Sequence, residues 1–101
     1  MEIITMVKGK IADEDINTFE EAYNAIKEEP APEGLIASYL LKDMIDPSIY
    51  KVETVWANPE ILKKIMKEGS VSADIKLFEQ FDTDPTVEIY EVRNNFPQYE
   101  E

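Results

Sequence analysis

The chain has 101 residues, of which 44% are hydrophobic and 32% are charged, so it suits one domain with one hydrophobic core and is too short for two. Ten basic residues against 22 acidic ones give a formal net charge of −12. A charge of this sign repels a phosphate backbone or an anionic membrane surface at long range, which excludes nucleic acid and membranes as partners.

The sequence contains no cysteine and no histidine. It therefore lacks thiolate ligands and nucleophiles, and it also lacks the commonest general base, metal ligand and haem ligand. We predict that the protein uses no metal and no cofactor. Residues 1–8 lack the basic start of a signal peptide, and no apolar run reaches the roughly 18 residues of a membrane span, so we expect a cytoplasmic protein.

In chain order, the first predicted element is a short apolar strand over residues 3–7, which ends near Gly9. A helix follows, with Asp13 or Asp15 as its N-cap. Its apolar face has three- and four-residue steps and consists of Ile16, Phe19, Tyr23 and Ile26. The run 29–34, which contains two prolines and a glycine, ends the helix in a turn.

Two strand-like runs at residues 35–41 and 50–57 come next, and the short link between them predicts an antiparallel hairpin. Asn58 as N-cap and Pro59 as first helical residue then begin a second helix, which Gly69 ends.

The last predicted elements are a third helix, a strand and a tail. Ser70 or Ser72 caps the helix, whose apolar residues recur at helical spacing as far as residue 81. Residues 87–92 alternate apolar and polar side chains, which indicates a strand, and residues 94–101 form a polar C-terminal tail.

The predicted order β-α-β-β-α-α-β, in one domain over residues 1–101, is typical of a ferredoxin-like α+β fold with all helices on one face of an antiparallel sheet. The strands at 3–7 and 35–41 nevertheless carry apolar residues on both faces. Because the helices cover only one face, we predict a homodimer in which a second copy covers the other. The alternative is a monomer whose loops or tail shield that face.

Four segments of the chain are similar to one family. They are Gly-Leu-Ile-Ala-Ser-Tyr at 34–39, Asp-Met-Ile-Asp-Pro at 43–47, Val-Trp-Ala-Asn-Pro-Glu-Ile-Leu at 55–62 and Val-Glu-Ile-Tyr-Glu-Val at 87–92. Together they resemble the antibiotic biosynthesis monooxygenase superfamily of dimeric α/β barrels, over most of residues 2–94. The most telling piece is Trp56, which ends the third strand just before a capped helix.

The resemblance implies a dimeric α/β barrel in a family of several functions. Its members include haem-degrading monooxygenases, isomerases and cofactor-independent oxygenases that act on polyketide aromatics or quinols. Haem degradation is disfavoured, because such members have a histidine on the helix that spans 72–81 here. Many other members place a histidine after the serine that precedes this helix. Ser70 is followed instead by Val-Ser-Ala-Asp, which offers no obvious substitute for an acid–base step.

Candidate site residues are polar or aromatic groups on otherwise apolar strands. The predicted catalytic residue is Glu53, a mid-strand carboxylate whose pKa burial would raise toward neutrality. The alternative is that Glu53 faces water or pairs with Lys51. The predicted cavity-lining residues are Thr5, Ser38, Tyr39, Trp56 and Tyr90. The two tyrosines suit a phenol or quinol oxygen, and the alternative for the aromatic residues is a role in the core.

Two pairs of aspartates, Asp43 with Asp46 and Asp82 with Asp84, have the oxygen ligands of a hard-cation site. Both pairs adjoin a proline turn, where aspartate commonly hydrogen-bonds the local backbone, and this explanation is the favoured one.

The sequence thus predicts a cofactor-independent monooxygenase acting on a small aromatic or quinol-like molecule, in which the substrate anion itself reduces oxygen. The alternative is a non-catalytic small-molecule-binding or stress-associated dimeric barrel, which the lack of histidine and cysteine favours. An isomerase or lyase acting on a small enolisable acid would need the same buried carboxylate as the oxygenase.

Overall fold

The computed structural model describes residues 1–68 and 70–97, with the side chains of 1–64 and 73–97. The elements are β1 (Ile3–Lys10), a 3-10 turn η1 (Asp13–Asp15), α1 (Ile16–Lys27), β2 (Leu35–Lys42), β3 (Ile49–Trp56), α2 (Pro59–Glu68), α3 (Ser70–Glu79) and β4 (Thr86–Glu91). This order confirms the predicted α+β fold. The predicted helix end at Gly69, the serine caps of the third helix and the tail beyond residue 97 lie outside the described residues and side chains.

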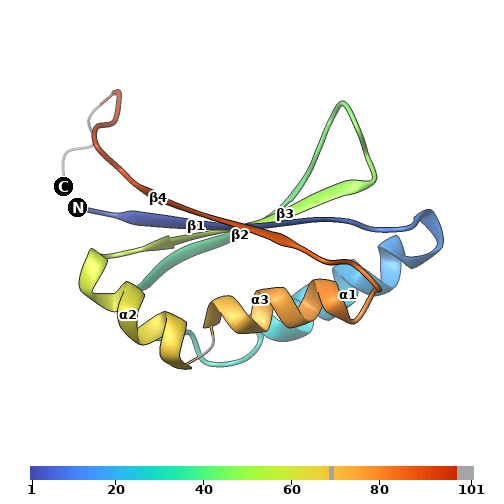
Figure 1. Ribbon diagram of the computed structural model, residues 1–101, viewed down its shortest axis with the longest axis horizontal. Helices are drawn as coiled ribbons and strands as arrows, with labels where there is room; N and C mark the ends of the chain where they lie inside the picture. The colour runs from blue at the N-terminus through green and yellow to red at the C-terminus, as the bar shows by residue number, and fades with distance from the viewer. Residues whose placement is uncertain (69, 98–101) are drawn as a thin grey trace.

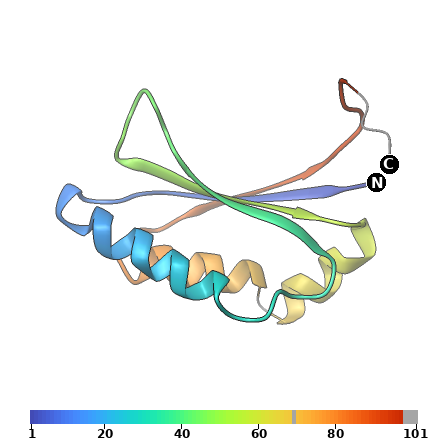
Figure 2. The same cartoon turned by 180° about the vertical axis from the view of Figure 1, so that it is seen from behind.

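The four strands form one antiparallel sheet in the order β2-β3-β1-β4. The predicted hairpin of β2 and β3 is confirmed. All three α-helices lie on one face of the sheet, and no described helix covers the other face (Figures 1 and 2). We call this second face the open face. None of the described helices is long and apolar enough to cross a membrane.

The hydrophobic core lies between the sheet and the helices. Along β1 and β3 alternate side chains point into it, and the register pairs Ile3 with Trp56 and Val7 with Val52. Phe19 of α1 is fully buried, and its ring packs against the aromatic rings of Tyr50, Phe78 and Phe81 at centroid distances of 5.0 to 5.4 Å. Alternate residues of the strands and the apolar face of the helix therefore pack into a single core.

The two predicted helix starts turn out differently. Asn58 Oδ1 accepts a hydrogen bond from the Ile61 N–H at 3.2 Å, and α2 begins at Pro59, so the predicted cap is confirmed. For α1 the predicted N-cap position is confirmed, but the expected hydrogen bond from the carboxylate is not formed. Asp15 occupies the N-cap position, but its side chain makes no capping hydrogen bond. The preceding 3-10 turn instead pairs the Asp15 N–H with the Ala12 carbonyl at 2.9 Å.

The described part of the C-terminal segment leaves the open face uncovered. It projects from the sheet at one end, while the β2–β3 connection projects at the other (Figure 1), and Phe96 is 98% exposed. Several large apolar side chains remain exposed on the strands, among them Tyr39, Leu41 and Tyr90. The described residues of the tail therefore do not shield the open face.

Gly34 ends the turn before β2 in a conformation that only glycine adopts freely, with φ of +83°. A Cβ at this position would lie 1.9 Å from Ile61 Cδ1 of α2. We expect Gly34→Ala to lower the free energy of unfolding by about 2–3 kcal/mol, from backbone strain and the steric clash together. Urea unfolding measures the loss. In an Ile61→Val background, which lacks Cδ1 but keeps Cγ1 and Cγ2 at 3.0 and 3.2 Å from the added Cβ, the loss should become smaller, and an unchanged loss would contradict the assigned clash.

Candidate active site

A cavity of about 430 Å³ opens between the sheet, α1, the α1–β2 turn and α3. Apolar walls come from Ile26 and Leu35, together with prolines of the turn. The polar groups that line it are those of Tyr23, Ser38, Thr54, Trp56 and Asp74, with Lys27 and Glu29 also part of the lining. A mostly apolar cavity of this size with a few polar groups is the usual form of a small-molecule site.

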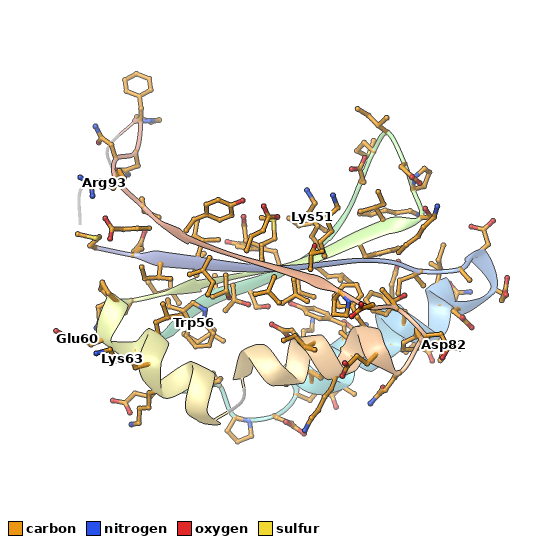
Figure 3. All side chains as sticks on the ribbon, in the orientation of Figure 1. Lys51, Trp56, Glu60, Lys63, Asp82 and Arg93 are labelled. Carbon is orange, nitrogen blue, oxygen red and sulfur yellow. The ribbon has the colours of Figure 1, made fainter. Side chains whose placement is uncertain are left out.

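Trp56 forms a fixed wall of this cavity. Its side chain points from β3 toward the helices (Figure 3) and is 1% exposed. Trp56 Nε1–H donates to Thr5 Oγ1 at 3.0 Å, and Thr5 is equally buried on the neighbouring strand β1. Thr5 therefore holds the indole in place from behind. Trp56 belongs to the lining of the cavity, and Thr5 lies outside it.

The hydroxyls of Tyr23 and Ser38 meet at 2.8 Å, and either can donate. Tyr23 projects from α1 and is 6% exposed, whereas Ser38 comes from β2 and is exposed. Ser38 reaches this face because a register irregularity between Leu35 and Ala37 changes which β2 residues face the helices. Each hydroxyl can make a further hydrogen bond, so the pair can bind a polar atom of a ligand.

Asp74 of α3 is the buried carboxyl group of the cavity, with a side chain that is 8% exposed. Burial raises its pKa from the ordinary value of 3.8 to about 7, and neither a neighbouring charge nor a hydrogen bond among the described groups offsets this effect. A carboxyl group that titrates near neutrality can take and return a proton at physiological pH. Asp74 is thus the group best suited to acid–base chemistry among the described residues.

Sequence reasoning missed Asp74, although it examined the run after Ser70 for a histidine. This run was predicted to offer no obvious substitute for the histidine, and the structure shows that its residue Asp74 is a buried carboxyl group. A signal was present, because Asp74 precedes Leu77 and Phe78 by three and four residues and so shares their buried helix face. An acidic residue on the apolar face of a predicted helix marks a buried carboxyl group.

The remaining predicted site residues, Glu53, Tyr39 and Tyr90, lie on the open face, across the sheet from the cavity. The register pairs Glu53 with Tyr39, and Glu53 is half-buried in the single chain. The Tyr90 hydroxyl donates to Glu88 Oε2, and this hydrogen bond raises the pKa of Tyr90. The structure therefore separates these residues from Ser38 and Trp56, and a catalytic role for Glu53 stays a prediction.

The open face consists of side-chain rows that cross the sheet. One row is apolar, the next contains two glutamates and the third contains two lysines. From β4 to β2 these rows are Tyr90-Ile4-Val55-Ala37, Glu88-Met6-Glu53-Tyr39 and Thr86-Lys8-Lys51-Leu41. Lys8 and Lys51 stand directly opposite each other, and Lys51 projects away from the helices (Figure 3). Like charges in this arrangement destabilise a sheet unless another group neutralises them.

The first of the two aspartate pairs, Asp43 with Asp46, makes local hydrogen bonds. Asp43 Oδ1 accepts the N–H groups of Asp46 and Ile45 at 3.0 and 2.7 Å, and these bonds lower its pKa. Asp46 accepts the hydroxyl and the N–H of Ser48, which lowers the pKa of Asp46. In the described part of the chain, no group of three carboxylates is arranged to hold a metal ion. The turn geometry alone accounts for Asp43 and Asp46.

Comparison with solved structures gives close matches over nearly the whole chain. A protein from Deinococcus radiodurans, provisionally named an antibiotic biosynthesis monooxygenase, aligns with a TM-score of 0.76 over 97% of this chain and 99% of its own, at 13% identity. The chain has the fold of the antibiotic biosynthesis monooxygenases. No protein-family model matches the sequence, and a search of curated proteins finds no relative.

Two further structures extend the comparison. A point variant of SnoaB, a cofactor-independent oxygenase from Streptomyces nogalater, matches with a TM-score of 0.71 over 96% of this chain and 98% of its own, at 14% identity. A conserved protein from Methanosarcina mazei matches with a TM-score of 0.70 over 89% of this chain and 91% of its own, at 21% identity. At these identities the likeness establishes the shared fold, and the activity has to be argued from the site.

Proposed function

We propose that this protein is a cofactor-independent monooxygenase that acts on a small aromatic or quinol-like molecule. The observation that carries the proposal is Asp74, a buried carboxyl group with a pKa of about 7 that lines a small-molecule cavity. The shared fold supports it, because SnoaB has the same fold and is a cofactor-independent oxygenase. The cavity offers what such a reaction needs from a protein, namely a base, an apolar wall and positioning groups.

The chemistry follows from the substrate's own reducing power. Asp74 removes a proton from a phenol hydroxyl or from a methylene group that the phenol ring activates, and the resulting anion, whose charge is delocalised onto carbon, transfers one electron to dioxygen. The two radicals combine into a C–O bond, and the peroxide then loses water as Asp74 returns a proton. For a methylene the balance is one methylene group and one dioxygen giving one carbonyl group and one water, so the carbon supplies all four electrons and no external reductant is needed. A dry site keeps the carbanion from being reprotonated by water.

Oxygen uptake tests the proposal. Supplied with a panel of hydroquinones, naphthols and aromatic methylene compounds, the wild type should consume dioxygen with at least one of them. Asp74→Asn should lower kcat about a hundredfold or more, because the amide keeps the shape of the side chain and cannot take a proton. Glu79→Gln is the matched control, since Glu79 is an exposed carboxylate of the same helix α3 and should leave the rate unchanged.

Other outcomes of this experiment point elsewhere. A variant Asp74→Asn that keeps full activity, alongside a Glu53→Gln variant that loses it, would move the base to the open face. Binding of panel compounds without oxygen uptake or product would favour the non-catalytic barrel. Exchange of a substrate proton with solvent deuterium without oxygen uptake would favour an isomerase.

We propose further that the protein is a homodimer, formed by two copies that pack their open faces together. The three rows of that face carry two lysines and two glutamates, so the face is not acidic although the chain has a net charge of −12. Because the glutamate row lies beside the lysine row, a two-fold axis between the rows sets each row against the opposite charge of the second copy. The apolar row and the exposed Tyr39, Leu41 and Tyr90 are buried in the same step.

A further inference from the structure

The cavity contains a buried carboxyl group with no described positive charge beside it. Among the described residues, Asp74 is the only buried carboxyl group of the cavity, and no cation lies within hydrogen-bonding reach of it. The elements packed around it contribute Tyr23 and Lys27 from α1 and Glu29 from the turn, whereas the strand residues Thr54 and Trp56 do not ionise. Lys27 and Glu29 are both exposed and opposite in sign. No described positive charge therefore lies in the buried part of the cavity.

We propose that this cavity binds an uncharged ligand through one hydroxyl or carbonyl oxygen held to the Asp74 carboxyl group, and that it rejects carboxylates and other anions. This inference concerns the cavity of the proposed function, and it narrows the substrate to neutral molecules. It holds equally for a ligand that is bound and never oxidised.

The hydrogen-bonding capacity of the cavity matches a neutral oxygen. A protonated carboxyl group donates one hydrogen bond and accepts another, and an ionised one only accepts, so a hydroxyl suits both states of Asp74. The paired hydroxyls of Tyr23 and Ser38 reach the cavity from different elements than Asp74 and can bind a second oxygen of the ligand. A ligand with two such oxygens would pair with Asp74 and with the Tyr23–Ser38 hydroxyls at the same time.

Electrostatic repulsion opposes the binding of an anion both at long range and inside the cavity. Far from the protein, the net charge of −12 repels it. Inside the cavity, an anion would face the Asp74 carboxylate in a poorly solvated site, where like charges repel more strongly than in water. The local repulsion has a defined pH dependence, because Asp74 is mostly neutral below a pH of about 7 and mostly charged above it.

Calorimetric titration of the wild type with naphthol and naphthoate, substituted at the same ring position, tests the inference. At about pH 8 we expect naphthol to bind at least roughly tenfold more tightly than naphthoate. At about pH 5.5 naphthoate is still an anion while Asp74 is neutral, so the ratio of the affinity for naphthol to that for naphthoate should become smaller. In Asp74→Asn the ratio should be small at both pH values, whereas Glu79→Gln should behave as the wild type does.

Equal affinity for the two ligands in the wild type at about pH 8 would overturn the inference, as would the absence of binding by either. These results require no variant, so a folding defect of Asp74→Asn leaves the test intact. The two proposals also fail separately. Selective naphthol binding without oxygen uptake with any substrate would defeat the oxygenase and leave the neutral-ligand site. Turnover of an aromatic carboxylate would defeat the selectivity and leave the oxygenase.

Discussion

A chain in which Lys8 and Lys51 are both changed to glutamate is expected to be monomeric at concentrations where the wild type is dimeric. In the proposed dimer these lysines face Glu53 and Glu88 of the second copy, and the change sets four acidic groups of one face against their equivalents. We expect the dissociation constant of the dimer to rise about a hundredfold or more, as when one side of an interfacial charge pair is lost. Sedimentation velocity over a dilution series measures it.

The double change also makes the chain more acidic. A matched control shows whether dissociation comes from the changed interface or from the added negative charge alone. Lys63→Glu with Lys76→Glu alters net charge equally, but both lysines are exposed on helices α2 and α3, away from the open face. This control should stay dimeric. A chain carrying Glu53→Lys and Glu88→Lys should dissociate alone and form a heterodimer when mixed with the Lys8→Glu, Lys51→Glu chain. A wild type that is monomeric throughout, or a double variant that stays dimeric, would refute this interface.

The free energy of unfolding of the wild type, relative to Asp74→Asn, is expected to fall as the pH rises from about 4 to about 7. The folded chain holds the Asp74 proton up to a pKa of about 7, whereas an unfolded chain releases it at the ordinary value of 3.8. Between these values the folded state binds more protons, so stability declines with rising pH and then levels off. The full pKa difference corresponds to roughly 4 kcal/mol at most, and we expect about 2–4 kcal/mol.

Urea unfolding of both chains at a series of pH values measures this difference. The subtraction matters, because lowering the pH also reduces the self-repulsion of a chain with a net charge of −12 and stabilises both proteins. Glu79→Gln, which removes an exposed carboxylate of the same helix, should give no such change relative to the wild type. If the free energy of unfolding changes with pH in the same way in Asp74→Asn and in the wild type, Asp74 titrates as an ordinary carboxyl group.

Stability and function therefore oppose each other at one residue. A leucine or asparagine at position 74 would suit the buried side of α3 better above neutral pH, since it would remove the cost of an ionised group in an apolar site. A carboxyl group held there at the expense of stability is what a site for proton transfer requires. The same reasoning makes Asp74→Asn a variant that gains stability at alkaline pH while losing the proposed activity.

The order of elements was predictable because each one has a clear periodicity. The helix starting at Pro59 illustrates this, since Asn58, Pro59 and the apolar steps after them all indicate the same boundary. The start of α1 was predicted less well. Its acidic residues suit a cap, but the 3-10 turn that leads out of β1 uses the backbone instead, and the sequence does not show which of the two geometries the chain adopts.

The candidate site was predictable only in part. Strand alternation separated Ser38 from Tyr39 and Glu53 from Trp56, but it did not say which of the two faces the helices cover. The register irregularity near Leu35 further decided that Ser38 reaches the cavity. Asp74 was missed because acidic residues on helices are usually solvated, and its burial depends on how α3 packs against the sheet.

Trp56, in the wall of the cavity, can serve as an intrinsic fluorescent probe. Trp56 is the only tryptophan of the chain, and it is 1% exposed, hydrogen-bonded through Nε1 and in contact with the cavity space. The indole fluorescence of the protein therefore has a single origin, in a buried and fixed environment. Its emission wavelength reports the polarity of the cavity wall in the native protein, and its shift to the red on unfolding marks the moment when water reaches that wall.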